Sequence, residues 1–117
     1  MDLEDDNELI EEVVAVGGLK IQIWRADLQH ALDGHPEVTL DRVRVALRDP
    51  LKVIKSKTSH RVCLFYAFES QDEQSGERIY FCTVVGVIRD GIGKMETAYE
   101  TTYIKTGEVL FERRKKL

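Results

Sequence analysis

The sequence predicts an α+β domain in which two N-terminal helices pack on one face of a four- to five-stranded antiparallel sheet. Helical spacing of apolar residues is confined to the first half of the chain, whereas the second half consists of short apolar or alternating runs between turn residues. A chain of 117 residues supports one hydrophobic core but not two. No apolar run approaches the ~20 residues of a membrane-spanning helix. The acidic opening differs from a basic and apolar leader, so a cytoplasmic location is expected.

Charge is unevenly distributed along the chain, although the net charge is only −4. Residues 1–12 contain seven acids and no base, so they are expected to form an acidic lead-in, frayed or briefly helical, before a single domain at residues 13–117. Residues 42–61, here called the basic band, contain one acid and seven bases: Arg42, Arg44, Arg48, Lys52, Lys55, Lys57 and Arg61. This local excess of positive charge favours a polyanion partner, although a solvated helix face and turn would carry the same residues.

The first half of the domain is expected to contain a β-hairpin and two helices. Short strands at 13–16 and 19–24 flank a Gly-Gly turn. Apolar residues at 28, 31 and 32 have helical spacing, and the Gly and Pro that follow end this helix. In the second helix Thr39 is the expected N-cap, Val43, Ala46 and Leu47 form an apolar stripe, and Asp49-Pro50 ends it.

The second half of the domain is expected to be a meander of strands. The expected strands are 51–54, 62–68, 79–88, 95–104 and 109–111, with a loop at 70–77 and a hairpin turn at 90–93. The near-continuous apolar runs at 62–68 and 79–88 are typical of interior strands that are covered on both faces. Cys63 and Cys82 lie inside these runs and are therefore expected to be buried thiols.

Two histidines are candidates for acid–base chemistry. His30 and His35 lie in and just after the first helix, and a histidine side chain exchanges a proton near neutral pH. The alternative is that both are ordinary surface residues of the helix and its end. The chain has no cysteine or histidine spacing typical of a zinc site and no phosphate-binding glycine loop before a helix, so neither a metal nor another cofactor is expected.

The strand at 95–103 is the third candidate feature. Alternation places Thr97, Tyr99 and Tyr103 on one face, where a core-facing strand would more often carry Val, Ile or Leu. Hydroxyl groups can donate hydrogen bonds to phosphate oxygens, and tyrosine rings can stack on bases. The alternative is that the tyrosines are half-buried with hydrated hydroxyls.

In this order, the features resemble the phage-associated branch of the barnase/EndoU/colicin/RelE superfamily. The resemblance spans about residues 19–112 and rests on residues 28–38, Val43 to Val53, 62–66, 79–87, 97–99 and Gly107. It implies a metal-independent endoribonuclease, toxin-like or prophage-derived, that cleaves RNA through attack of the 2′-hydroxyl on the adjacent phosphodiester. RNA would be its substrate, and an antitoxin or immunity protein would be a possible partner.

The resemblance also assigns roles to residues of this chain. His35 takes the His-Pro-Glu position, with His30 as the competing histidine, and the hydroxyl–aromatic pair is Thr97 and Tyr99. Arg61 and Lys52 take the basic positions. The catalytic candidates are therefore His35, His30, Arg61, Thr97 and Tyr99, and the RNA-binding candidates are Arg42, Lys52, Lys55, Lys57 and Tyr103. A catalytically silent domain that binds RNA or a protein is the alternative, and convergence of His35, Arg61 and Thr97/Tyr99 on one concave surface would distinguish the two.

Overall fold

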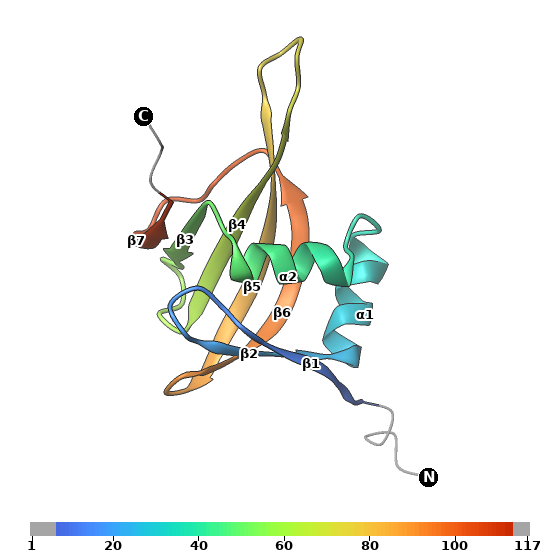
Figure 1. Ribbon diagram of the computed structural model, residues 1–117, viewed down its shortest axis with the longest axis vertical. Coiled ribbons are helices and arrows are strands. Elements are labelled where there is room, and N and C mark those ends of the chain that lie inside the picture. Colours follow the sequence, from blue (N-terminus) through green and yellow to red (C-terminus); the bar gives the residue numbers. More distant parts are fainter. Residues whose placement is uncertain (1–6, 114–117) are drawn as a thin grey trace.

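The computed structural model describes residues 7–113 as a seven-stranded mixed sheet with two helices (Figure 1). The strand order is β1-β2-β6-β5-β4-β3-β7. The elements are β1 (Leu9–Val14), β2 (Lys20–Trp24), α1 (Arg25–Gly34), α2 (Leu40–Arg48), β3 (Lys52–Lys55), β4 (Val62–Gln71), β5 (Arg78–Arg89), β6 (Ile92–Thr101) and β7 (Glu108–Glu112). Neither helix has the length and apolar composition needed to cross a bilayer within this part of the chain.

The structure is α+β, but the predicted four- to five-stranded antiparallel sheet is wrong. The N-terminal hairpin joins the sheet because β2 pairs with β6 in parallel, with Ile21 opposite Gly93. At the other end, the chain crosses the sheet after β6, and β7 pairs with β3 on the far edge. Both additions bury apolar surface in the common core, since Val13 and Ile21 are fully buried and Phe111 packs against the same cluster. Local periodicity identifies strands, but it does not identify their partners.

The acidic lead-in expected at residues 1–12 is also partly wrong. Strand β1 begins at Leu9, so residues 9–12 belong to the sheet and are neither frayed nor helical. Ile10 packs against the core, and the carboxylate of Glu8 forms an ion pair with Arg25 at the start of α1. The first six residues of the predicted lead-in lie outside the described residues. Within this strand the carboxylate of Glu11 pairs with Arg44 and Arg48, so its negative charge is compatible with a place in the sheet.

Helix α2 follows the sequence prediction closely. The Thr39 hydroxyl accepts a hydrogen bond from the backbone N–H of Arg42 at 3.1 Å and so caps the helix. Val43, Ala46 and Leu47 are fully buried against the sheet, as their spacing predicts. Helix α1 has no side-chain cap, and Ala31 is its buried residue. Both helices contribute to one apolar cluster on the same side of the sheet.

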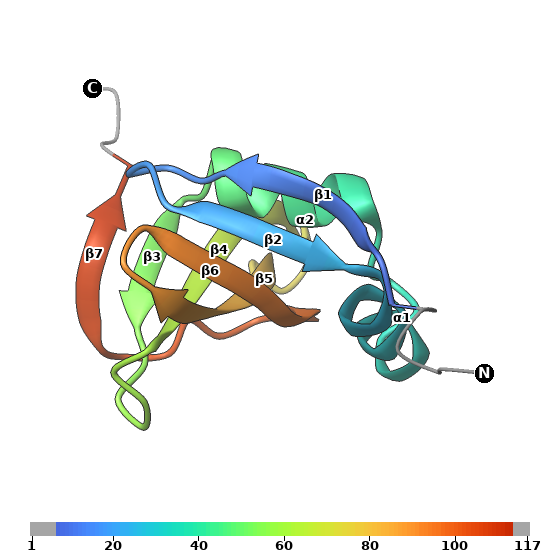
Figure 2. The same cartoon turned by 90° about the horizontal axis from the view of Figure 1, so that it is seen from below.

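The opposite face of the sheet, here called the open face, has a smaller cluster of its own. Its buried members are Ile54, Leu64, Tyr66 and Cys82. The connection from β6 to β7, residues 102–107, crosses this face, and Figure 2 shows it on the side of the sheet away from α2. We call these residues the crossing segment; its Ile104 packs on the cluster. Strands β4 and β5 are therefore covered on both faces, and their cysteines are buried thiols, as expected.

Strands β4 and β5 continue beyond the rest of the sheet as a projecting hairpin (Figure 1). Where this hairpin leaves the sheet, the rings of Phe68 on β4 and Tyr80 on β5 make an edge-on contact, with centroids 6.4 Å apart, which stabilises the pairing of the two strands. The hairpin carries four acids between residues 69 and 77 and one base, Arg78, just after them. This end of the domain therefore carries more acidic than basic side chains.

Candidate anion-binding site

The structure brings together two of the predicted catalytic residues, His35 and Tyr99. His35 follows the last residue of α1, and its ring centroid lies 5.7 Å from that of Tyr99 on β6. The Nδ1 atom of His35 lies 3.6 Å from Oε2 of Glu37, whose carboxylate also accepts a 3.0 Å hydrogen bond from the backbone N–H of Glu100. This backbone hydrogen bond is the main reason that the pKa of Glu37 is lowered. His30, in contrast, is exposed on the surface of α1.

Arg42 of α2 is bound by two carboxylates. Its guanidinium lies 2.6 Å from the carboxylate of Glu100 and 3.6 Å from that of Glu69. It also donates to the backbone carbonyl of Glu37 at 3.1 Å and lies over the ring of Phe81. A guanidinium held in this way is not free to neutralise a phosphate group, so Arg42 has a structural role.

The remaining catalytic candidates do not converge on His35. The backbone carbonyl of Arg61 accepts a hydrogen bond from Val87, whereas Tyr99 is in register with Cys82. Val87 lies five residues beyond Cys82 on β5, so Arg61 and Tyr99 are about 17 Å apart along the sheet. The Tyr99 hydroxyl lies in the open-face cluster beside Cys82, and burial raises its pKa. Thr97 lies two residues before Tyr99 on β6, opposite Val84. The described residues therefore do not assemble the predicted catalytic set.

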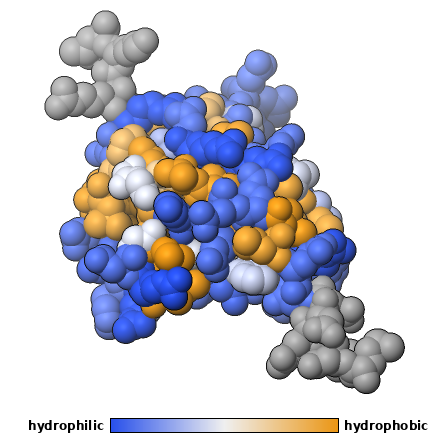
Figure 3. Space-filling model, turned by 60° about the horizontal axis from the view of Figure 1, so that its bottom comes forward, coloured by the Kyte–Doolittle hydropathy of each residue, from blue (hydrophilic) through white to orange (hydrophobic). Residues whose placement is uncertain are grey.

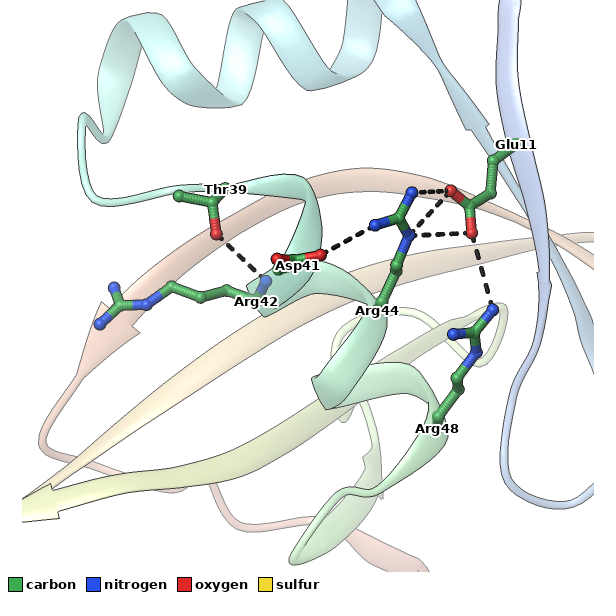
Figure 4. Close-up of polar contacts among 6 residues, drawn as sticks. All are labelled: Glu11, Thr39, Asp41, Arg42, Arg44 and Arg48. Carbon is green, nitrogen blue, oxygen red and sulfur yellow. Dashed lines mark hydrogen bonds and ion pairs between the residues drawn. The ribbon is translucent and has the colours of Figure 1, made fainter.

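Most of the basic band is neutralised within the domain. Figure 4 shows Arg44 of α2 between Glu11, at 2.6 Å, and Asp41, at 2.8 Å, with Arg48 approaching Glu11 at 3.7 Å. Lys52 lies 3.6 Å from Glu112 of β7. With Arg42, four cations of the band are thus paired with carboxylates. Lys55, Lys57 and Arg61 make no ion pair with any residue between 7 and 113.

A hollow of about 230 Å³, here called the turn pocket, lies between the β3–β4 turn and the crossing segment. It is lined by Ser56, Lys57, Thr58, Leu64, Tyr103, Lys105 and Thr106. Lys57 and Lys105 come from separate segments, are exposed, and have no carboxylate partner in the described part of the chain. The side of the pocket formed by Leu64 is buried, whereas Tyr103 remains 61% exposed. Two predicted RNA-binding residues, Lys57 and Tyr103, therefore share one hollow.

Local hydrogen bonds give the walls of the turn pocket a defined shape. The hydroxyls of Ser56 and Thr58 lie 3.0 Å apart, and the Ser56 hydroxyl accepts from the backbone N–H of Thr58 at 3.2 Å. On the other wall, the Thr101 hydroxyl accepts from the backbone N–H of Tyr103 at 3.1 Å and donates to its carbonyl at 3.2 Å. Ammonium groups and hydroxyls bind phosphate oxygens, and an exposed tyrosine ring can stack on a base.

Lys105 and Thr106 were not identified from the sequence. They follow the last predicted long strand and precede Gly107, so local pattern marks them only as part of a turn. They reach the β3–β4 turn because the crossing segment passes over the open face to the far edge of the sheet. No local signal could have found them, since the crossing depends on the pairing of β7 with β3.

Two further hollows among the described residues differ in chemistry from the turn pocket. A hollow of about 210 Å³ between the β1–β2 turn and β7 is lined by apolar side chains, Gly17 and Cys63. A shallow groove over α2 contains the paired charges of Glu11, Asp41 and Arg44. On the face drawn in Figure 3, apolar residues form separate patches among hydrophilic ones. No three His, Cys, Asp or Glu side chains of residues 7–113 gather in a way that could hold a metal ion.

Comparisons with protein-family models, with curated proteins and with solved structures find no match for this chain. The resemblance to a ribonuclease superfamily thus stays a prediction from the residues, and the chemistry of the site is the basis for a functional assignment. The fold and the site define a small α+β domain with a basic, hydroxyl-lined pocket on the open face of its sheet.

Proposed function

We propose that this domain binds single-stranded RNA at the turn pocket without cleaving it. The observation that carries the proposal is the meeting of Lys57, Lys105 and the exposed ring of Tyr103 around one hollow, with no carboxylate paired to either lysine in the described region. Unpaired cations supply sequence-independent attraction to phosphates, and an aromatic ring supplies a stacking surface for a base.

Each wall of the turn pocket has a role in this proposal. The ammonium groups of Lys57 and Lys105 contact phosphate oxygens, and the hydroxyls of Ser56 and Thr58 can bond to a phosphate or a 2′-hydroxyl group. Tyr103 stacks on one base. At about 230 Å³, the hollow is smaller than the roughly 300–1,000 Å³ of pockets that engulf drug-sized ligands, which fits recognition of one unit of a longer chain.

RNA cleavage is the second candidate function, and the contact between His35 and Tyr99 is the observation that favours it. Attack of a 2′-hydroxyl on a phosphodiester needs a cation beside the developing charge as well as an acid and a base. The Glu37 carboxylate lies beside His35, and Arg42 is held by the Glu100 carboxylate and the backbone carbonyl of Glu37. The geometry therefore supports binding better than cleavage. An antitoxin or immunity protein would be needed only if the chain cleaves RNA.

The binding proposal can be tested by fluorescence anisotropy with a labelled, unstructured oligoribonucleotide at low salt. Lys57→Ala, Lys105→Ala and Tyr103→Ala are each expected to raise Kd about 5- to 30-fold, since a phosphate contact or a stacked base contributes about 1–2 kcal/mol. Lys20→Ala is the matched control, because Lys20 is exposed and unpaired within the described residues but lies on β2. Equal effects of Lys20→Ala and the pocket lysine variants would overturn the assignment.

Cleavage can be tested with the same RNA. The purified protein is incubated with it in EDTA, and any cut ends are mapped. Intact RNA is expected. Cut ends that disappear in the His35→Ala variant would instead establish the nuclease and would show that binding without cleavage is wrong.

A further inference from the structure

Lys105 reaches the turn pocket only because the crossing segment is held in place over the open face. We propose that Tyr66 is a positioning residue for Lys105, acting through its buried hydroxyl rather than by touching RNA. This inference rests on the proposed RNA-binding function and names a residue outside the pocket on which its affinity depends.

One hydrogen bond carries the inference. The backbone N–H of Lys105 donates to the Tyr66 hydroxyl at 3.2 Å, and this bond joins residues 39 positions apart in the sequence. Tyr66 is fully buried, so the hydroxyl that meets the crossing segment belongs to a side chain that is itself enclosed by the domain. The bond therefore ties an exposed segment to a rigid point of the sheet.

Tyr66 is itself well placed to act as an anchor. It lies on β4 between Lys52 of β3 and Cys82 of β5, in the interior of the sheet. Tyr66 and Cys82 belong to the same buried cluster, and burial raises the pKa of Tyr66 to about 12. The phenol therefore keeps its proton at neutral pH, and its oxygen can still accept the hydrogen bond from Lys105.

The two neighbouring contacts of the crossing segment are apolar or steric. Ile104 packs on the open-face cluster, and a Cβ on Gly107 would come within 2.7 Å of Cγ2 of Ile54. These contacts keep the segment close to the sheet but do not fix the main chain at Lys105 along the strand direction. The directional Tyr66 hydrogen bond supplies that constraint.

Loss of the bond should lower affinity without removing any group that touches RNA. Without the bond, the segment can sample positions in which Lys105 faces away from the pocket. The apparent Kd is then the intrinsic Kd divided by the fraction of molecules in which Lys105 faces the pocket. Tyr66→Phe keeps the ring and removes one hydroxyl. It is expected to raise Kd about 2- to 12-fold, which corresponds to the usual net contribution of a neutral hydrogen bond.

The experiment is a double-mutant cycle on the full chain, with RNA affinity measured for Tyr66→Phe, Lys105→Ala and the double variant. If Tyr66 acts through Lys105, adding Tyr66→Phe to Lys105→Ala raises Kd no further. Hydrogen exchange at the Lys105 amide is expected to accelerate in Tyr66→Phe. Tyr80→Phe is the control, since Tyr80 packs on the same cluster and its hydroxyl makes no hydrogen bond to residues 102–107.

The outcomes separate this inference from the proposed function. No effect of Lys105→Ala on affinity would overturn the RNA-binding assignment itself. A loss of affinity in Lys105→Ala with none in Tyr66→Phe would overturn the positioning role alone. Additive effects in the double variant, or an equal loss in Tyr80→Phe, would show that Tyr66 acts through general packing and not through Lys105.

Discussion

Arg44 of α2 holds Glu11 of β1 through both carboxylate oxygens. Its Nε atom lies 2.8 and 3.0 Å from the two oxygens, and its Nη2 atom lies 2.6 Å from one of them. The same guanidinium bonds Asp41 in the first turn of α2 (Figure 4). This arrangement joins the helix to an edge strand whose first four residues, 9–12, were expected to belong to the acidic lead-in. It also explains why Arg44 is unavailable to an external anion.

Glu11→Gln is expected to lower the free energy of unfolding by about 1 kcal/mol at pH 7, the upper value for a partly exposed ion pair. The hydrogen bonds from Arg44 lower the pKa of Glu11 below 4.5 in the folded protein. The contribution of ionised Glu11 to stability is therefore complete above pH 4.5, the pKa of an ordinary glutamate. It is lost as the pH falls through the lower pKa that Glu11 has in the folded protein. Denaturant unfolding between pH 7 and pH 3 should show a weaker acid dependence in Glu11→Gln. Glu12→Gln, an exposed neighbour without an ion pair among residues 7–113, should behave like the unaltered protein. Equal losses in both variants would contradict this role of Glu11.

Two N-terminal deletions should differ sharply in stability. Removal of residues 1–6 retains all of β1 and should change the melting temperature little. Removal of residues 1–12 takes away most of β1, the packing of Ile10 and the partner of Arg44, so a loss of several kcal/mol is expected. Thermal unfolding followed by circular dichroism distinguishes them. Similar melting temperatures for the two deletions would mean that β1 contributes little to the fold.

Gly107→Ala is expected to destabilise the domain and weaken RNA binding together. An added Cβ would meet the backbone carbonyl of Lys55 and the side chain of Ile54, so the crossing segment would have to move. Overpacking of this kind costs about 1–3 kcal/mol. Gly34→Ala is the control, because a Cβ there meets no atom within 4 Å. Unfolding and anisotropy measurements on both variants check the prediction. Unchanged stability of Gly107→Ala would show that the crossing segment can move to accommodate the added Cβ.

Arg42→Ala and Lys57→Ala should have opposite effects, although the sequence places both in the basic band. Arg42 bonds the carboxylate of Glu100 and a backbone carbonyl, so its removal should reduce stability by about 1 kcal/mol and leave RNA affinity within about 2-fold. Lys57 has no such partner among the described residues, so its removal should weaken binding and spare stability. Parallel measurements of Kd and of unfolding test this contrast. A greater loss of RNA affinity in Arg42→Ala than in Lys57→Ala would show that RNA binds at α2 and not at the turn pocket.

Several local features could be predicted because neighbouring residues alone determine them. Thr39 caps α2, and the apolar stripe of that helix is buried, because helix periodicity and capping depend on residues within one or two turns. The apolar runs around Cys63 and Cys82 are interior strands because few polar side chains interrupt them. The Gly17-Gly18 turn between the first two strands has positive φ at both residues, which glycine adopts readily.

Other features follow only from contacts between distant parts of the chain. The parallel pairing of β2 with β6 and the crossing to β7 depend on which strands bury the most apolar surface together, and period-two patterns carry no such information. Whether a cation of the basic band is available to a ligand also depends on the carboxylates that folding places beside it. Glu11 and Glu112 neutralise Arg44 and Lys52, although they lie far from them in the sequence.

By itself, the sequence determined an α+β class, two helices, a set of strands and an excess of cations near the middle of the chain. These follow from periodicity, turn residues and composition, which are local properties. Tertiary structure decided the sheet order, the separation of Arg61 from Tyr99, and the meeting of Lys57 with Lys105. Charges act over a short range in salt, so a cation is available to a ligand only where folding has left it without a carboxylate beside it.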